Sequence, residues 1–154
     1  MTAAASTLFS PRGSGQEIEE GQTFAPKFDA GGLISCVVTD IHTGAVLMVA
    51  HMNAQALERT ISTGEAWFYS RSRQALWKKG EISGHVMRVA EIRVDCDQDV
   101  LWLKVDEAGT GACHTGRRSC FYRAIVREAP DGPVTLVLRD GERVFDPAEV
   151  YGKS

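Results

Sequence analysis

The apolar residues of this chain fall into short runs that are rich in β-branched side chains and are separated by polar turns. Apolar runs of about four to eight residues, bounded by Gly, Asn or Asp, are typical of β-strands. We expect strands at residues 33–39, 45–50, 66–69, 86–94, 100–105, 121–126 and 134–138. This pattern predicts a strand-dominated α+β fold, and a length of 154 residues suits one small domain.

Turn and capping residues refine this pattern. Residues 33–39 and 45–50 are joined by DIHTG, which predicts a β-hairpin with Gly44 at a positive φ. Asn53 is a good N-cap for a helix that runs through Ile61 and ends at Gly64. We also expect a second, shorter helix at residues 74–79.

The first 23 residues differ in composition from the rest of the chain. They are rich in Gly, Ser and Glu, so we expect a flexible N-terminal tail at residues 1–23 and one domain at 24–154. The tail has no basic start followed by an apolar segment, and its glutamates are untypical of transit peptides. We therefore expect a cytoplasmic protein.

Charge and hydropathy exclude several classes of function. The net charge of -3 and the pI near 5.8 argue against generic binding to nucleic acid or to an anionic membrane, because both depend on clustered cationic surface. The longest apolar runs, such as residues 45–50, are far shorter than the roughly 20 residues needed to cross a bilayer. An integral membrane protein is therefore not expected.

Hard and soft metal ligands alternate in the segment DCDQD at residues 95–99. On an extended backbone Asp95, Asp97 and Asp99 would share one face of a strand, and Cys96 would point to the other. Carboxylates select Mg²⁺-like ions, whereas thiolates select Zn²⁺. The segment predicts a magnesium site beside a zinc site, and the alternative is a solvated acidic edge.

Three of the four cysteines, Cys96, Cys113 and Cys120, are candidate metal ligands. The fourth, Cys36, lies in an apolar run and is expected to be buried. A catalytic zinc site keeps three protein ligands and leaves one position for water. Three cysteines without a CxxC pair fit that pattern, and His114 could fill the fourth position or act as an acid/base. The alternative is three unrelated cysteines in a core.

Basic residues gather in two short segments that also contain Ser and Gly. Arginine in such loops binds phosphate through paired hydrogen bonds, and serine hydroxyls add donors. A substrate with more than one phosphate would fit, although ordinary surface charge is the alternative. The candidate phosphate ligands are Ser70, Arg71, Ser72, Arg73, Lys78, Lys79, Arg117 and Arg118.

Two kinds of histidine are expected. His85 follows Ser83 and Gly84, where glycine permits close approach of the backbone, so its imidazole is a candidate general acid or base. A structural role for His85 is the alternative. His42 falls in a turn and His51 ends a strand, so we expect neither to take part in the chemistry.

Five ordered segments carry a family resemblance. They are SRSR at 70–73, LWKKGE at 76–81, SGH at 83–85, DCDQD at 95–99 and CHTGRRSCFY at 113–122. Together they resemble the phosphoribosyl-AMP cyclohydrolases of histidine biosynthesis, over residues 24–123. The resemblance implies a homodimer with active sites at the subunit interface. It also implies Mg²⁺ at the three aspartates and one Zn²⁺ per subunit, held by Cys113 and Cys120 of one subunit and by Cys96 of the other.

The reaction implied by the resemblance is hydrolytic opening of the purine ring of 1-(5-phosphoribosyl)-AMP between N1 and C6. The product is the formimino-carboxamide ribonucleotide. A zinc-activated water would open the ring, His114 and His85 would move protons, and the basic residues would hold the two phosphates.

Two other classes of function compete with this reaction. Another zinc-dependent nucleotide hydrolase, such as a deaminase, would share the chemistry, but the pattern His-x-Glu followed by Pro-Cys-x-x-Cys is absent. A zinc-stabilised binding module would predict a closed four-ligand site and a basic or aromatic face, and the sequence shows neither.

Overall fold

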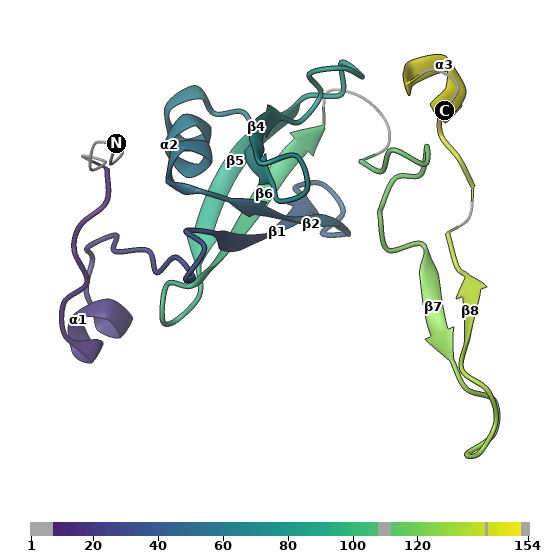
Figure 1. Cartoon of the computed structure of the whole chain (residues 1–154), viewed down its shortest axis with the longest axis horizontal. Coiled ribbons are helices and arrows are strands. Elements are labelled where there is room, and N and C mark those ends of the chain that lie inside the picture. The colour runs from purple at the N-terminus through teal and green to yellow at the C-terminus, as the bar shows by residue number, and fades with distance from the viewer. Residues whose placement is uncertain (1–7, 108–111, 141, 152–154) are drawn as a thin grey trace.

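A four-stranded mixed sheet lies at the centre of the fold (Figure 1). In the order β2-β1-β6-β5, its strands are β1 (Ile34–Asp40), β2 (Val46–Met52), β5 (Met87–Val94) and β6 (Val100–Glu107). β1 pairs antiparallel with β2 and parallel with β6, and β5 pairs antiparallel with β6. The computed structural model describes residues 8–107, 112–140 and 142–151. The predicted strand-dominated α+β domain is confirmed.

The β1–β2 hairpin and the following helix have the predicted turn and cap residues. Gly44 adopts φ 76° in the hairpin turn. The side chain of Asn53 accepts a hydrogen bond from the backbone N–H of Ala56 at 2.8 Å, and this cap begins α2 (Ala54–Thr63). Gly64 ends the helix in the left-handed conformation, with φ 74°. Both predictions are confirmed.

The short helix expected at residues 74–79 is wrong. β3 (Trp67–Ser70) and β4 (Ala75–Lys78) form an antiparallel hairpin in this region. Phe68 lies opposite Trp77, with 5.0 Å between their ring centroids, and Gln74 makes the turn with φ 49°. Cross-strand packing of aromatic residues therefore outweighs the local preference for a helix.

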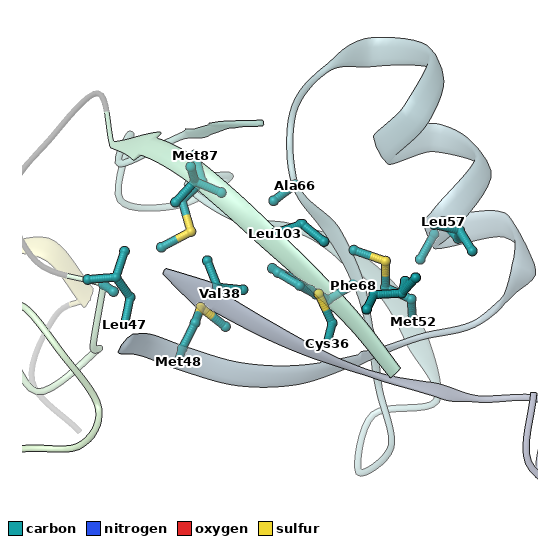
Figure 2. Packing of buried hydrophobic residues seen from close by; sticks show 14 of the residues in the cluster. Cys36, Val38, Leu47, Met48, Met52, Leu57, Ala66, Phe68, Met87 and Leu103 are labelled. Carbon is teal, nitrogen blue, oxygen red and sulfur yellow. The ribbon is translucent and has the colours of Figure 1, made fainter. Parts of the chain in front are cut away.

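The hydrophobic core lies between the inner face of the sheet, α2 and β3. Figure 2 shows Leu57 of α2 pointing toward Met52 and Phe68, with Cys36 and Leu103 of the sheet nearby. Each such buried side chain contributes about 1.5–3 kcal/mol. Cys36 is fully buried in this cluster, as predicted, and burial raises the pKa of its thiol far above the ordinary range.

The structure describes residues 8–23 of the segment where a flexible tail is expected at residues 1–23. A capping box between Ser14 and Glu17 begins α1 (Gly15–Glu20). The ring of Phe9 packs edge-on against Phe24, with centroids 5.5 Å apart. The expectation rested on composition, which does not reveal a capping box or a single apolar residue that packs against the domain. Residues 8–23 therefore make specific contacts, whereas residues 1–7 lie outside the described part of the chain.

The C-terminal part forms a further hairpin, β7 (Arg123–Val126) with β8 (Thr135–Leu138), followed by α3 (Pro147–Tyr151). In Figure 1 this hairpin extends away from the central sheet. Its side chains include exposed apolar groups, with 78% of Ile125 and 55% of Leu136 accessible. Such a surface is typical of one that another protein chain covers.

In the described ranges, no helix combines the length and apolar character required to span a membrane.

Candidate active site

The three aspartates of DCDQD converge at the turn between β5 and β6. One carboxylate oxygen from each of Asp95, Asp97 and Asp99 lies within 4.8 Å of the others. The extended strand expected here is wrong, because the segment is a turn in which Gln98 adopts φ 58°. Asp95 Oδ1 closes the turn by accepting from the backbone N–H of Asp99 at 2.9 Å. Turn geometry, rather than strand alternation, therefore gathers the carboxylates.

The three carboxylates of this cluster repel one another. Side-chain hydrogen bonds with Asp95 and Asp97, together with repulsion from their charges, raise the pKa of Asp99 to about 6. A bound cation would relieve this repulsion, and carboxylate oxygens are the ligands that Mg²⁺ prefers. The three residues therefore fit the magnesium ion that the sequence predicts.

Gln98 ties this turn to the N-terminal segment. Its side chain is buried, and its Oε1 accepts from the backbone N–H of Ala25 at 2.8 Å. Its Nε2 donates to the carbonyl of Ile18 at 3.1 Å and to that of Thr23 at 3.3 Å. One buried amide therefore fixes the aspartate turn through three backbone groups.

Replacing Gln98 by alanine should lower the free energy of unfolding by about 2 kcal/mol, because buried backbone groups would lose their partners. Urea unfolding followed by tryptophan fluorescence would measure the change. Gln55→Ala, at an exposed position of α2, is the matched control and should change stability by less than about 0.5 kcal/mol. An equally small effect at Gln98 would contradict this role.

The segment CHTGRRSC at residues 113–120 folds into a tight turn held against β2. The backbone N–H of Cys113 donates to the carbonyl of Arg117 at 3.1 Å, and that of Cys120 donates to Leu47 at 2.8 Å. This turn brings the thiols of Cys113 and Cys120 into hydrogen-bonding contact. Two of the three predicted zinc ligands therefore lie together.

A buried lysine stands beside the two thiols. Lys79 is 8% exposed, and its Nζ donates to the carbonyl of Ala112. Burial and the neighbouring Cys113 raise the pKa of Cys120 to about 12, although Lys79 partly lowers it. Without a cation the Cys120 thiol therefore stays protonated at neutral pH, whereas a soft metal ion displaces thiol protons. This donor set fits zinc but supplies two ligands rather than three.

Cys96 does not join the other two thiols within the chain. It is exposed at the β5–β6 turn and lines a cavity of about 350 Å³ together with Ile18 of α1. Among the described residues, the three aspartates form a group that could hold a metal ion, whereas the three cysteines do not.

Two adjoining cavities lie beside the thiol pair. The first has a volume of about 860 Å³, and the second has a volume of about 370 Å³. They share Arg73, Trp77 and His114 in their walls, so they lie side by side. Cys120 lines the second cavity, which therefore opens next to the predicted zinc ligands.

Most of the predicted phosphate ligands line these cavities. They are Ser70, Arg71, Ser72 and Arg73 in the first, and Arg73, Lys78 and Lys79 in the second. Arg117 and Arg118 line neither of the two. The guanidinium of Arg117 lies over the ring of Tyr122, at 4.1 Å from its centroid, and Arg118 is exposed.

The predicted acid/base residues occupy different places. His114 is exposed and lies in the wall of both cavities. His85 lines neither of the two, and its ring packs edge-on against Phe145 with 5.0 Å between centroids. His42 lies at the surface and contacts Asp106 at 3.2 Å.

Sequence reasoning missed three groups near the cavities. His51 lies next to the end of β2 and lines the first cavity, and burial together with Arg71 lowers its pKa. Glu107 lies near Lys79, and burial raises its pKa to about 7. Tyr151 of α3 lines the second cavity. The contacts that place them arise from tertiary folding, and no local motif marked them.

Comparison with known proteins gives the family. A sequence model of the phosphoribosyl-AMP cyclohydrolase family matches residues 48–122. A phosphoribosyl-AMP cyclohydrolase from Rhodopseudomonas palustris strain HaA2 is 65% identical over 137 residues, which are 89% of this chain and 92% of the relative. Proteins of the same name from Nitrobacter winogradskyi and Bradyrhizobium diazoefficiens are each 62% identical, over 90% and 89% of this chain and 94% and 96% of their own lengths. The chain belongs to the phosphoribosyl-AMP cyclohydrolase family.

Membership of the phosphoribosyl-AMP cyclohydrolase family confirms the resemblance and identifies the chain as an enzyme. The match to the family model spans DCDQD, CHTGRRSC and the basic segments at residues 70–79. The elements β7, β8 and α3 follow the matched range.

Proposed function

We propose that this chain opens the purine ring of 1-(5-phosphoribosyl)-AMP between N1 and C6, as a step of histidine biosynthesis. The observation that carries this proposal is the adjoining pair of cavities: Arg71 lines the first, Cys120 lines the second, and Arg73 lines both. An anion-binding wall next to paired thiols suits a phosphorylated nucleotide whose ring is opened at a metal site. The names of the relatives agree with this substrate.

The basic residues orient the substrate. Arg71 and Arg73, with the hydroxyls of Ser70 and Ser72, bind one phosphate in the open cavity. Lys78, although paired with Glu65, lines the second cavity and adds positive charge for the other phosphate. Trp77 lies between the two cavities, where its ring can contact the base.

Cys113 and Cys120, together with the partner subunit's Cys96, would hold one Zn²⁺ per site, and the three aspartates would hold one Mg²⁺. The support is chemical: the chain brings two thiols together, and its third candidate thiol is exposed at a distant turn. When bound, zinc lowers the pKa of a coordinated water to about 7.

Proton transfer falls to the histidines. His114 lies in the wall of both cavities, so its imidazole reaches a substrate that spans them. It accepts the proton of the attacking water or delivers one to the leaving N1, which requires reach and a pKa near the operating pH. His85 is the second candidate for this transfer.

The working unit is a homodimer. One chain lacks a third thiol at the Cys113–Cys120 pair, and a second copy supplies it. The apolar residues exposed on the β7–β8 hairpin, which follows this pair directly in the sequence, offer a surface for the second copy.

Incubation of the purified protein with phosphoribosyl-AMP and Mg²⁺ tests the proposed function. We expect the formimino-carboxamide ribonucleotide as the product by mass spectrometry, no release of ammonia, and one zinc per subunit by elemental analysis. Ammonia release would instead indicate a deaminase. Zinc-loaded protein that leaves phosphoribosyl-AMP unchanged would overturn the proposed function.

A further inference from the structure

We propose that residues 142–151 form a wall of the substrate cavity, in which Tyr151 contacts the bound nucleotide and Phe145 positions His85. This inference rests on the proposed function. It concerns a segment that lies beyond the range matched by the family model, residues 48–122.

The segment is fitted closely to the turn that carries the zinc-binding thiols. The backbone N–H of Val144 donates to the carbonyl of Gly116 at 2.7 Å. Gly116 adopts φ 91°, and a Cβ at this position would lie 2.3 Å from the carbonyl oxygen of Phe145. A side chain at position 116 is therefore excluded by both strain and contact. The CHTG turn and the C-terminal segment form one unit.

The ring of Phe145 contacts the ring of His85. The two rings meet edge to face at 67°, with their centroids 5.0 Å apart. Nδ1 of His85 is buried and has no hydrogen-bond partner among the described residues. Because no hydrogen bond at Nδ1 holds the ring, we infer that the aromatic contact with Phe145 orients it. Phe145 therefore acts on the reaction through His85, as a positioning residue.

Tyr151 connects the C-terminal segment to the second cavity. Its ring packs against Phe145, with centroids 6.4 Å apart, and it lines the second cavity together with Lys79, His114 and Cys120. The side chain remains 41% exposed, so it is free to meet a ligand. A phenol among cationic groups donates a hydrogen bond to a phosphate or hydroxyl oxygen of a nucleotide. We place Tyr151 in contact with that ligand.

Steady-state kinetics with phosphoribosyl-AMP test the role of Tyr151. Tyr151→Phe keeps the ring and removes the hydroxyl, so KM should rise about fivefold while kcat stays within about twofold, as expected for one lost hydrogen bond. AMP serves as a binding probe by calorimetry, and its affinity should fall by the same factor. Ile61→Ala, on the exposed side of α2, is the control and should change neither value.

Phe145 is tested by kcat and by the NMR signals of His85. Phe145→Ala should lower kcat about tenfold and move the ring-proton signals of His85, whereas Phe145→Tyr, which keeps the ring, should restore both. Zinc content and melting temperature, measured on every variant, identify a change that is merely structural.

Two outcomes would overturn the inference. The first is wild-type kinetics in both Tyr151→Phe and Phe145→Ala, with an active wild-type enzyme. The second is unchanged AMP affinity in Tyr151→Phe together with unchanged His85 signals in Phe145→Ala. This result would overturn the inference even if the wild type does not act on phosphoribosyl-AMP. An inactive wild type with altered AMP affinity and His85 signals contradicts the proposed function instead and leaves the wall supported.

Discussion

Replacing Cys113 by alanine should lower kcat by at least about 10³-fold and remove zinc from the purified enzyme. Cys113 and Cys120 form the thiol pair that the fold assembles, and a site with one of them removed retains too few ligands to hold the ion. Without the ion, the reaction loses both an activated water and the charge that stabilises its transition state. Elemental analysis and single-turnover assays measure the two losses.

Cys36→Ala is the matched control for this variant. Cys36 is fully buried in the core and lines neither of the two cavities, so its replacement should cost stability without changing zinc content. Its kcat should remain within about twofold of the wild type. Retention of one zinc per subunit in Cys113→Ala would show that the metal is held elsewhere.

Replacing Asp97 by asparagine should abolish the rise in melting temperature that Mg²⁺ gives the wild type and lower kcat by about 10²-fold. The cluster brings three carboxylates within 4.8 Å, and removal of one charge weakens its attraction for a divalent cation. A ligand that binds the folded state stabilises it in proportion to its concentration and affinity. Thermal unfolding at several Mg²⁺ concentrations measures the effect.

The effect of Mg²⁺ should also depend on pH. The carboxyl of Asp99 has a pKa raised to about 6, so below that pH a proton competes with the cation. The stabilisation by Mg²⁺ should therefore be fully present above about pH 7 and fade as the pH falls through 6. Glu91→Gln, an exposed carboxylate on β5 paired with Arg93, is the control. A loss of the Mg²⁺ effect in this control as well would contradict a site at the aspartates.

The regular parts of the fold follow from local signals. The hairpin at Gly44 and the helix between Asn53 and Gly64 are specified by turn and cap residues, which act on their immediate neighbours. The prediction failed at residues 74–79, where Trp77 pairs across the hairpin with Phe68. That partner is set by the strand register, which local propensity does not reveal.

The ligand types of the site could be predicted, but not their geometry. The sequence suggested an extended strand at DCDQD, whereas the buried amide of Gln98 and the N-terminal segment fix a turn there. His51 and Tyr151 reach the cavities from elements that carry no motif of their own. Tertiary contacts of this kind become visible when the chain is folded.

Mixed dimers test the shared zinc site most directly. Cys96→Ala and Cys113→Ala proteins should each be inactive alone, because every site of either homodimer lacks one thiolate. After subunit exchange, one site of each mixed dimer regains Cys113, Cys120 and the partner subunit's Cys96. Random mixing of equal amounts should then restore about a quarter of the wild-type activity, because half of the dimers are mixed and each has one complete site. If native mass spectrometry shows mixed dimers and activity does not return, the zinc is not shared between subunits.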